Sequence, residues 1–444
     1  MSAIRLLRNG MRFWRAFGTR ALLREMQRRL TTPTPPGMGA ALSVGEQPPH
    51  RSGPASAQQL LSARFAQTLP LGTFVVPRDG RRRISLVTDS INKGSLFGGV
   101  GTAMILAALL ARQRGARLRV ITRTEPAQPS SLDNVLGLYG LSLDEEVEFA
   151  FAHVQAPQVS IDVFADELFI TTSWWTTAST VRTVAPAKIL YVLQEDERMF
   201  YPAGDDQLRC LRTLSDERVH VAVNTQGLLE HLIASGLPHL AHRARAFEPA
   251  FPSSIFAPRP RAAGEKHRLL FYARPNHLRN LFYFGLEVID QAVARGIIDT
   301  QEWEIHFVGA HVPAVSLCDG TVPVRHEHLS WQQYAELAGT ADLALSLMFT
   351  PHPSYPPLDM AASGAVVVTN TYGNKRDMAR YCANVIAADT QLEAMLDALR
   401  RGAALALDST QREANFASRQ LTGDWSTALA GVVQTFGTSS DAWT

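Results

Sequence analysis

The chain has 444 residues and a formal net charge of +2, with 46% hydrophobic and 19% charged residues. This length exceeds that of a usual single domain, so we expect two domains of roughly 150 to 200 residues each. The composition is typical of globular proteins with large buried sheets and excludes a disordered body. The near-neutral charge gives no reason to expect nucleic acid as a partner.

The sequence gives no sign of a zinc site or a membrane-spanning helix. Cys210, Cys318 and Cys382 lie far apart without CxxC spacing, which is typical of reduced thiols in the cytosol. A membrane-spanning helix needs about 18 consecutive apolar residues, and no apolar stretch of the sequence is that long. We therefore expect a metal-free protein that does not cross a membrane.

Residues 1–30 contain eight arginines and a single acidic residue, Glu25. Apolar residues recur there at roughly helical spacing, at Leu7, Met11, Trp14 and Phe17. The pattern predicts a basic amphipathic helix that could lie on an anionic membrane. We expect a cytoplasmic protein that could be peripheral at the inner face of the plasma membrane. A solvated extension, a helix packed on the body and an import presequence are the alternatives.

Residues 31–57 are rich in proline, glycine, alanine and serine, which is the composition of a disordered linker. From residue 83 onward, short β-branched runs alternate with helical patterns. This alternation predicts a parallel sheet with crossover helices, and therefore an N-terminal Rossmann-like domain over residues 58–250.

A glycine-rich loop follows the first strand of this domain and contains Gly98, Gly99, Val100 and Gly101. Backbone amides there can approach a ligand, and the amino end of the next helix favours negative charge. The spacing is neither GxGxxG nor a P-loop, so a tight connection without a ligand is the alternative.

Two later loops of this domain carry further candidate residues. Trp174 and Trp175 follow a strand and could stack on a sugar, although interdomain or core packing explains them equally well. The acidic run of Glu195, Asp196 and Glu197 could orient a hydroxyl or act as a base. A solvated acidic loop is the alternative, and the run is not the DxD arrangement of metal-dependent enzymes.

Prolines concentrate at residues 249–264, where we place the interdomain linker. The alternation then resumes and predicts a second Rossmann-like domain over residues 265–410. A C-terminal helix in residues 411–444 is expected to return to the N-terminal domain. The fold class is therefore α/β, with two doubly wound domains facing a central cleft, and ligands should bind at the carboxyl ends of the strands.

Two arginines mark the first strand of the second domain. Arg274 ends this strand and Arg279 follows five residues later, where a helical pattern begins. Two guanidinium groups near a helix amino end can clamp a diphosphate and stabilise charge on a leaving group without a metal. Solvated arginines at a strand end are the alternative.

The stretch LSLMFTPHPSYPPLDMAASGAVVVTN runs from a buried strand through prolines to a helix expected to start at Leu358 and Asp359. Polar residues in the loop before this helix and in the turn after the next strand could approach a ligand. They are His352, Ser354, Tyr355, Tyr372 and Asn374. For the last two, a plain turn is the alternative.

Over residues 80–435 the chain resembles family 4 glycosyltransferases of the GT-B fold, and among them the WsaF type of rhamnosyltransferase. The shared motifs are GGVGT, YARP and PHPSYPPL. The resemblance implies that Arg274 and Arg279 bind the donor diphosphate and that Asp359 replaces a glutamate that holds the ribose. A first glutamate of the family falls on Pro351, and this departure puts one sugar contact in doubt.

The resemblance implies transfer of L-rhamnose from dTDP-L-rhamnose to a saccharide or lipid-linked saccharide in cell-surface polysaccharide synthesis. It also implies that the transfer retains the anomeric configuration and needs neither a metal nor a cofactor. The implied catalytic residues are Arg274, Arg279 and Asp196. The implied donor-binding residues are Gly98, Gly99, Val100, Gly101, His352, Ser354, Tyr355, Asp359, Tyr372 and Asn374. The implied acceptor-binding residues are Trp174, Trp175, Glu195 and Glu197. A catalytically weak nucleotide-sugar-binding subunit and a sugar-nucleotide epimerase are the rival functions.

Overall fold

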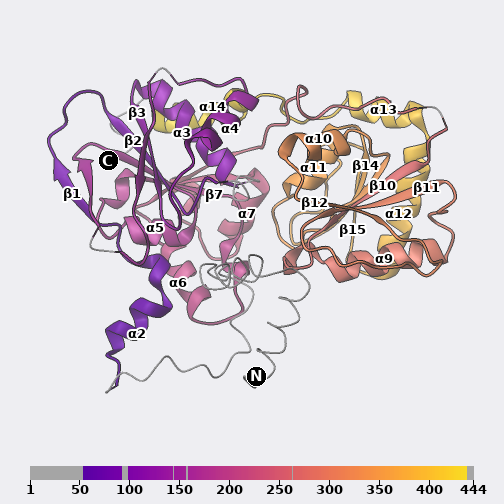
Figure 1. Ribbon diagram of the computed structural model, residues 1–444, viewed down its shortest axis with the longest axis horizontal. Helices are drawn as coiled ribbons and strands as arrows, with labels where there is room; N and C mark the ends of the chain where they lie inside the picture. Colours follow the sequence, from indigo (N-terminus) through magenta and orange to yellow (C-terminus); the bar gives the residue numbers. More distant parts are fainter. Residues whose placement is uncertain (1–53, 93–98, 144, 157–158, 263, 438–444) are drawn as a thin grey trace, which may run out of the picture. The chain divides into compact units, whose positions relative to one another are not determined.

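The computed structural model describes residues 54–92, 99–143, 145–156, 159–262 and 264–437 (Figure 1). The predicted amphipathic helix at 1–30, most of the predicted linker and Gly98 lie outside these residues. Among the described helices, none is long and apolar enough to cross a membrane.

The first half of the chain forms a seven-stranded parallel sheet with the order β4-β3-β2-β6-β7-β8-β9. Its strands are β2 (Arg83–Thr88), β3 (Arg117–Thr122), β4 (Glu148–Phe151), β6 (Leu168–Thr171), β7 (Ile189–Leu193), β8 (His220–Asn224) and β9 (Ala244–Phe247). The central strands are buried along their whole length because helices cover both faces of the sheet.

Helices α3 (Gly101–Arg114) and α4 (Pro129–Leu138) share a core with one face of this sheet. The other face packs against α5 (Trp174–Thr180), α6 (Asp205–Leu214), α7 (Gln226–Ala234) and α8 (Leu240–Arg243). The sheet is therefore doubly wound, as predicted.

The second half forms a six-stranded parallel sheet with the order β12-β11-β10-β13-β14-β15. Its strands are β10 (His267–Ala273), β11 (Trp303–Gly309), β12 (Val324–Glu327), β13 (Leu343–Leu345), β14 (Val366–Asn370) and β15 (Val385–Ala388). One face packs against α9 (Phe282–Ala294) and α12 (Leu392–Leu407), and the other against α10 (Trp331–Ala338) and α11 (Tyr355–Ala362). The prediction of two doubly wound α/β domains is thus confirmed.

Helix α11 begins at Tyr355, three residues before the start predicted at Leu358. The prediction was wrong because Pro356 and Pro357 were read as a break before the helix. In the first turn of a helix, a proline loses no hydrogen bond and its fixed φ suits the helix.

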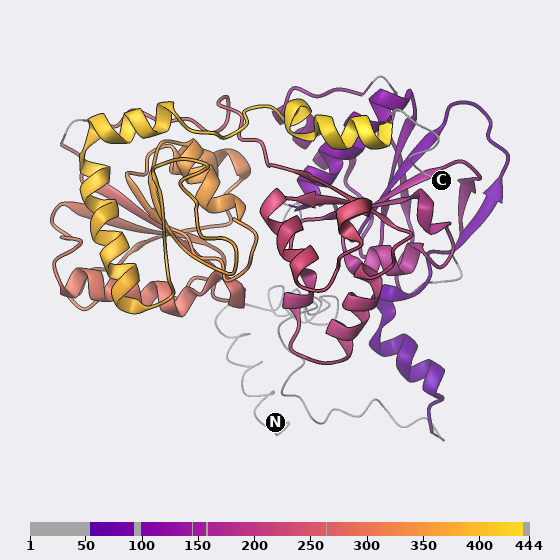
Figure 2. The same ribbon diagram turned by 180° about the vertical axis from the view of Figure 1, so that it is seen from behind.

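The last part of the chain differs from the single helix predicted for residues 411–444. Helix α13 (Ser409–Ala417) follows α12, and α14 (Trp425–Gly437) is separate and packs against α3 and β9. Figure 2 shows α14 in yellow beside the purple helix α3. This packing explains why α3 is buried from Gly101 to Ala111, since the sheet covers one side and α14 another.

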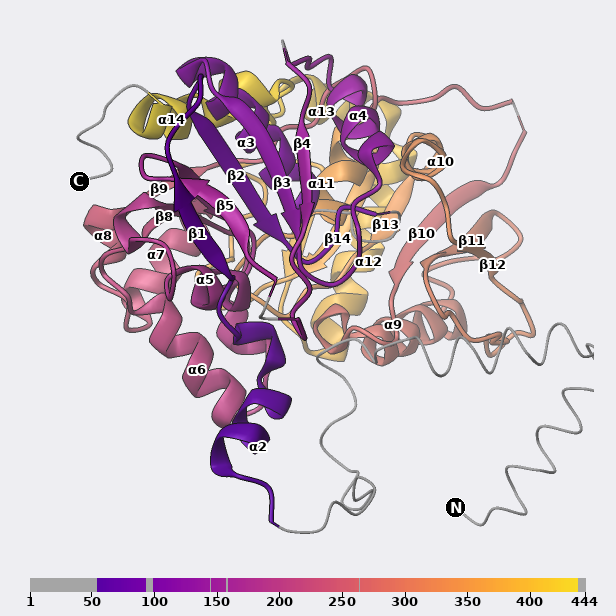
Figure 3. The ribbon, with the colours of Figure 1, turned by 60° about the vertical axis from the view of Figure 1, so that its left-hand side comes forward.

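Outside the two large sheets, β1 (Thr73–Val76) pairs in parallel with β5 (Ile161–Phe164), and the two lie side by side in Figure 3. Helix α2 (Ala57–Arg64) and the 3-10 helix η1 (Ala66–Thr68) precede β1. Other short 3-10 helices are η3 (Pro186–Lys188), η4 (Glu197–Phe200) and η5 (Leu278–Asn280).

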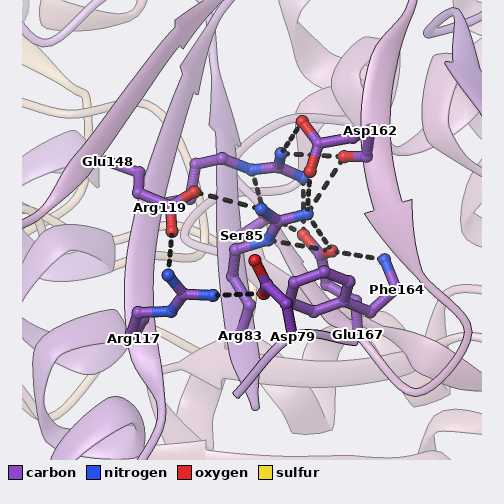
Figure 4. Close-up of polar contacts among 9 residues, drawn as sticks. All are labelled: Asp79, Arg83, Ser85, Arg117, Arg119, Glu148, Asp162, Phe164 and Glu167. Carbon is purple, nitrogen blue, oxygen red and sulfur yellow. Dashed lines mark hydrogen bonds and ion pairs between the residues drawn. The ribbon is translucent and has the colours of Figure 1, made fainter. Parts of the chain in front are cut away.

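A buried charge cluster joins β5 and the turn before β6 to strands β2, β3 and β4 of the first sheet (Figure 4). Glu167 is 0% exposed and binds Arg83 at 2.9 Å, Arg119 at 2.6 Å, Ser85 and the backbone N–H of Phe164. Asp162 and Glu148 add carboxylates around Arg83, and the ring of Phe164 lies 4.1 Å from its guanidinium carbon. Sequence reasoning gave no sign of this cluster, because its members come from four separate strands and the turn before β6.

Candidate functional site

The arginine pair lies where the sequence places it, at the carboxyl end of β10. Arg274 follows the strand and contacts the imidazole of His277. Arg279 lies in η5, and its carbonyl accepts a 2.7 Å hydrogen bond from the N–H of Phe349, in the loop after β13. Helix α9 starts at Phe282, three residues after Arg279, so the arginines belong to a loop and a 3-10 turn.

The side chain of Arg279 faces the first sheet. Its Nη1 lies 3.3 Å from Oε2 of Glu195, which follows β7, and its guanidinium carbon lies 4.3 Å from the ring of Phe200. Burial raises the pKa of Glu195, and the positive charge of Arg279 opposes that rise. The geometry therefore joins a cation from the second domain to a buried carboxylate from the first.

The three acidic residues after β7 have different surroundings. Asp196 caps η4 and accepts two hydrogen bonds from Arg198 at 2.7 and 2.8 Å, and His231 lies 3.3 Å from it. Burial raises the pKa of Glu197 to about 8, and its carboxylate accepts a 2.7 Å bond from the N–H of Trp174. Glu195, rather than the predicted catalytic Asp196, is the acid that faces Arg279, because Arg198 engages both oxygens of Asp196.

Both tryptophans have packing partners within the first domain. Trp174 is 3% exposed, and its indole N–H donates to the hydroxyl of Tyr201 at 3.0 Å. Trp175 donates to Asp89 at 2.7 Å. For Trp174 this arrangement favours the packing role over stacking on an acceptor, since the ring has little free face.

The loop before α11 holds several of the predicted donor-binding residues in buried positions. The ring of His352 is 4% exposed, and its Nδ1 accepts a 2.9 Å bond from the N–H of Ser354. Ser354 has a φ of 71°, a conformation that L-residues rarely adopt. Asp359 is buried under Tyr334, whose hydroxyl donates to one carboxylate oxygen at 3.3 Å. The other oxygen of Asp359 has no hydrogen-bond partner within the described chain.

Tyr355 connects the two sheets through its hydroxyl group. This oxygen accepts a bond from Asn224 at 2.6 Å, donates to Gln194 at 3.2 Å and contacts the hydroxyl of Thr102 at 2.8 Å. Gln194 also donates to the carbonyl of Gly99. The sequence did not single out Gln194 or Asn224 as site residues, although both stand at carboxyl ends of strands.

We expect Tyr355→Phe to lower the free energy of unfolding by about 1–3 kcal/mol, because it removes the hydroxyl that accepts from the buried amide of Asn224 and donates to Gln194. Urea unfolding followed by fluorescence measures this, with Tyr283→Phe, an exposed tyrosine on α9, as the control. Equal stability of the two variants would contradict the bridging role.

The glycine loop and the turn after β14 complete the residues at these strand ends. A Cβ on Gly99 would lie 3.2 Å from the amide nitrogen of Gln194, so the glycine permits close approach. Val100 and Gly101 lie at the amino end of α3. The amide of Asn374 donates to the carbonyl of Gly227 at 2.7 Å, and Tyr372 packs edge-on against Phe349.

Sequence reasoning also missed Lys375, which follows Asn374. Its side chain is buried, and its Nζ donates to the carbonyl of Met348 at 2.5 Å. No motif marks this residue, so only its place after a strand could have suggested it. Within the described chain, no group of three or more His, Cys, Asp or Glu side chains could hold a metal ion.

Two doubly wound parallel sheets, with candidate residues at the carboxyl ends of both, define the GT-B class of fold. Solved structures of this class are similar to the chain at low sequence identity. They include Anabaena HepE in complex with UDP and glucose, at 12% identity and a TM-score of 0.55, covering 81% of this chain and 100% of that one. Sucrose-phosphate synthase from Thermosynechococcus elongatus matches at 13% identity and a TM-score of 0.53, covering 80% and 98%.

The family models described as the WsaF N-terminal domain and the WsaF C-terminal domain match residues 83–225 and 267–400. Together they cover more than half of the sequence, and the chain belongs to this family. A curated relative, the O-antigen biosynthesis protein RfbC of Myxococcus xanthus, is 25% identical over 314 residues. That alignment covers 69% of this chain but spans only 23% of the length of the relative.

Proposed function

We propose that the protein is a glycosyltransferase that moves a sugar from a nucleoside-diphosphate sugar to a saccharide acceptor. The proposal depends on the position of Arg279. This residue lies at the carboxyl end of the second sheet and faces Glu195 from the first sheet. A cation held there is suited to bind the diphosphate of a donor, and a carboxylate across from it to orient an acceptor.

In the proposed reaction, the bond between the anomeric carbon and the donor phosphate oxygen breaks, and a bond from that carbon to the acceptor oxygen forms. Arg279 and Arg274 stabilise the charge that develops on the leaving diphosphate. The departing phosphate oxygen takes the acceptor proton on the same face of the sugar, which gives retention. No metal takes part in these steps.

We further propose dTDP-L-rhamnose as the donor, on the basis of the WsaF family and of Asp359, a shorter acid than the glutamate at this position in family 4. One free oxygen of Asp359 is compatible with a deoxyribose, which offers fewer hydroxyls. A rival donor comes from the fold neighbours, since HepE was solved with UDP and with UDP-glucose.

A nucleotide panel tests this choice. We expect dTDP to raise the melting temperature more than UDP or GDP do, because a ligand that binds only the folded protein stabilises it. Differential scanning fluorimetry with each nucleotide at millimolar concentration measures the shift. A clear preference for UDP would refute the thymidine assignment while leaving glycosyl transfer in place.

For the acceptor we propose a saccharide or lipid-linked saccharide of a cell-surface polysaccharide, handled at the cytoplasmic face of the membrane. The O-antigen function in the name of the Myxococcus relative supports this choice. The eight arginines of residues 1–30 would suit work at an anionic surface.

A second candidate function is a nucleotide-sugar-binding subunit with little activity. Pro351 favours it, since family 4 enzymes carry a glutamate at this position. Incubation with dTDP-L-rhamnose and a saccharide acceptor, followed by mass spectrometry of the products, separates the two functions.

A further inference from the structure

Lys375 is a buried lysine in a chain that carries most of its positive charge on arginine. Of the 43 basic residues only four are lysines, at positions 93, 188, 266 and 375. Lys375 closes the turn after β14, where its backbone pairs with that of Tyr372, and it is 6% exposed. Burying a cation costs stability unless an opposite charge and hydrogen bonds compensate it. The buried position of Lys375 therefore needs an explanation.

Lys375 and Arg279 are anchored on adjacent residues of one loop. Nζ of Lys375 donates to the carbonyl of Met348 at 2.5 Å, and the N–H of Phe349 donates to the carbonyl of Arg279 at 2.7 Å. The side chain of Asn370 fixes this loop through a 2.7 Å bond to the N–H of Met348. The two cations are therefore held in a fixed relation to each other by the loop after β13.

The carboxylate of Glu195 acts on both Arg279 and Lys375. Glu195 lies 3.3 Å from Arg279, and its negative charge also acts on Lys375. Burial lowers the pKa of Lys375 to about 7, and Glu195 opposes this shift without cancelling it. Glu195 alone does not neutralise Arg279 together with a protonated Lys375, and a dianionic group would neutralise the two better.

His352 adds an unused hydrogen-bond donor to the same group. Burial, with further contributions from Lys375 and Arg279, lowers the pKa of His352 to about 3, so the ring is neutral. Its Nδ1 accepts a bond from the backbone N–H of Ser354, so the proton must be on Nε2. Within the described residues Nε2 has no partner, although the side chain is 96% buried.

We propose, on the basis of the function proposed above, that Lys375 and the Nε2–H of His352 complete the diphosphate site formed by Arg279. Glu195 is the internal counter-ion of that site, and the donor diphosphate displaces it. Exchange of a single negative charge for a dianion satisfies both cations and gives the His352 donor an acceptor.

The proposal makes donor binding depend on pH. The charged or titratable groups that act on Lys375 are Glu195 after β7 and His352 before α11, and Tyr372 pairs with it through the backbone. Without ligand, Lys375 is mostly neutral at pH 8, and a bound diphosphate raises its pKa. Binding at pH 8 therefore takes up a proton, and affinity falls as the pH rises above about 7.

Isothermal titration of the full-length protein with dTDP and with UDP, in buffers of different ionisation enthalpy, tests this. We expect Lys375→Met to weaken binding of the diphosphate by roughly 10- to 100-fold and to abolish proton uptake. Lys375→Arg keeps the charge but cannot titrate, so it should bind well without proton uptake. Lys266→Met is the matched control, because Lys266 is exposed and also donates to a backbone carbonyl, that of Thr300.

Glu195→Gln provides a second test that does not depend on how well the Lys375 variants fold. Removal of the competing charge should tighten diphosphate binding several-fold, and weaker binding would overturn the counter-ion role. If Lys375→Met and Lys375→Arg bind and take up protons like the unmodified protein while Arg279→Ala does not bind, the inference is wrong and the proposed function stands. If the unmodified protein binds neither nucleotide, both fail.

Discussion

Arg279→Ala is expected to reduce sugar transfer by roughly 10²- to 10³-fold, because it removes a preorganised charge from the leaving diphosphate. The side chain is largely buried beside Glu195, and its backbone carbonyl is held by the N–H of Phe349, so the charge is fixed in place before the donor binds. The variant also leaves Glu195 buried without its nearest cation, so the pKa of Glu195 should rise further.

The loss should appear in turnover of the nucleotide sugar, followed by release of the nucleoside diphosphate, and in nucleotide binding by thermal shift. Arg295→Ala is the control, since Arg295 is an exposed residue after α9 paired with Glu393 at the surface. Transfer at the unmodified rate by Arg279→Ala would place the diphosphate elsewhere and remove the central observation of the proposal.

Glu167→Ala is expected to destabilise the first domain by about 3–5 kcal/mol, because it leaves the charges of Arg83 and Arg119 buried without their central partner. The carboxylate of Glu167 is 0% exposed and binds both guanidinium groups, Ser85 and the N–H of Phe164. Partial compensation by Asp162 is limited, because that residue is nearly half exposed.

Thermal unfolding should show this as a fall in melting temperature on the order of 10 °C. The neighbouring residue supplies the control: Asp166 pairs with Arg78 at the surface, and Asp166→Ala should change stability by less than about 0.5 kcal/mol. Similar melting temperatures for the two variants would show that other carboxylates can neutralise the buried arginines.

The candidate site was predictable where a residue follows a strand and its chemistry is conspicuous. Arg274 and Arg279 stand out because two guanidinium groups flank the end of one strand, and Tyr355 because it lies in a proline-rich loop after a strand. Lys375 and Gln194 were not found, because a single polar residue after a strand is common in any α/β protein. Their importance depends on partners from elements far away in the chain.

The fold class and the order of the elements could be predicted, since β-branched runs and helical patterns alternate along both halves of the chain, as parallel strands buried on both faces require. Which charges meet depends on how the folded sheets bring distant residues together. The tertiary structure placed Glu195 rather than Asp196 against Arg279, and it brought the partners of Glu167 together from separate strands. The physical reason is that hydrophobic periodicity is local and repeats along the chain, whereas an ion pair depends on two side chains that only the folded sheets bring within a few ångströms.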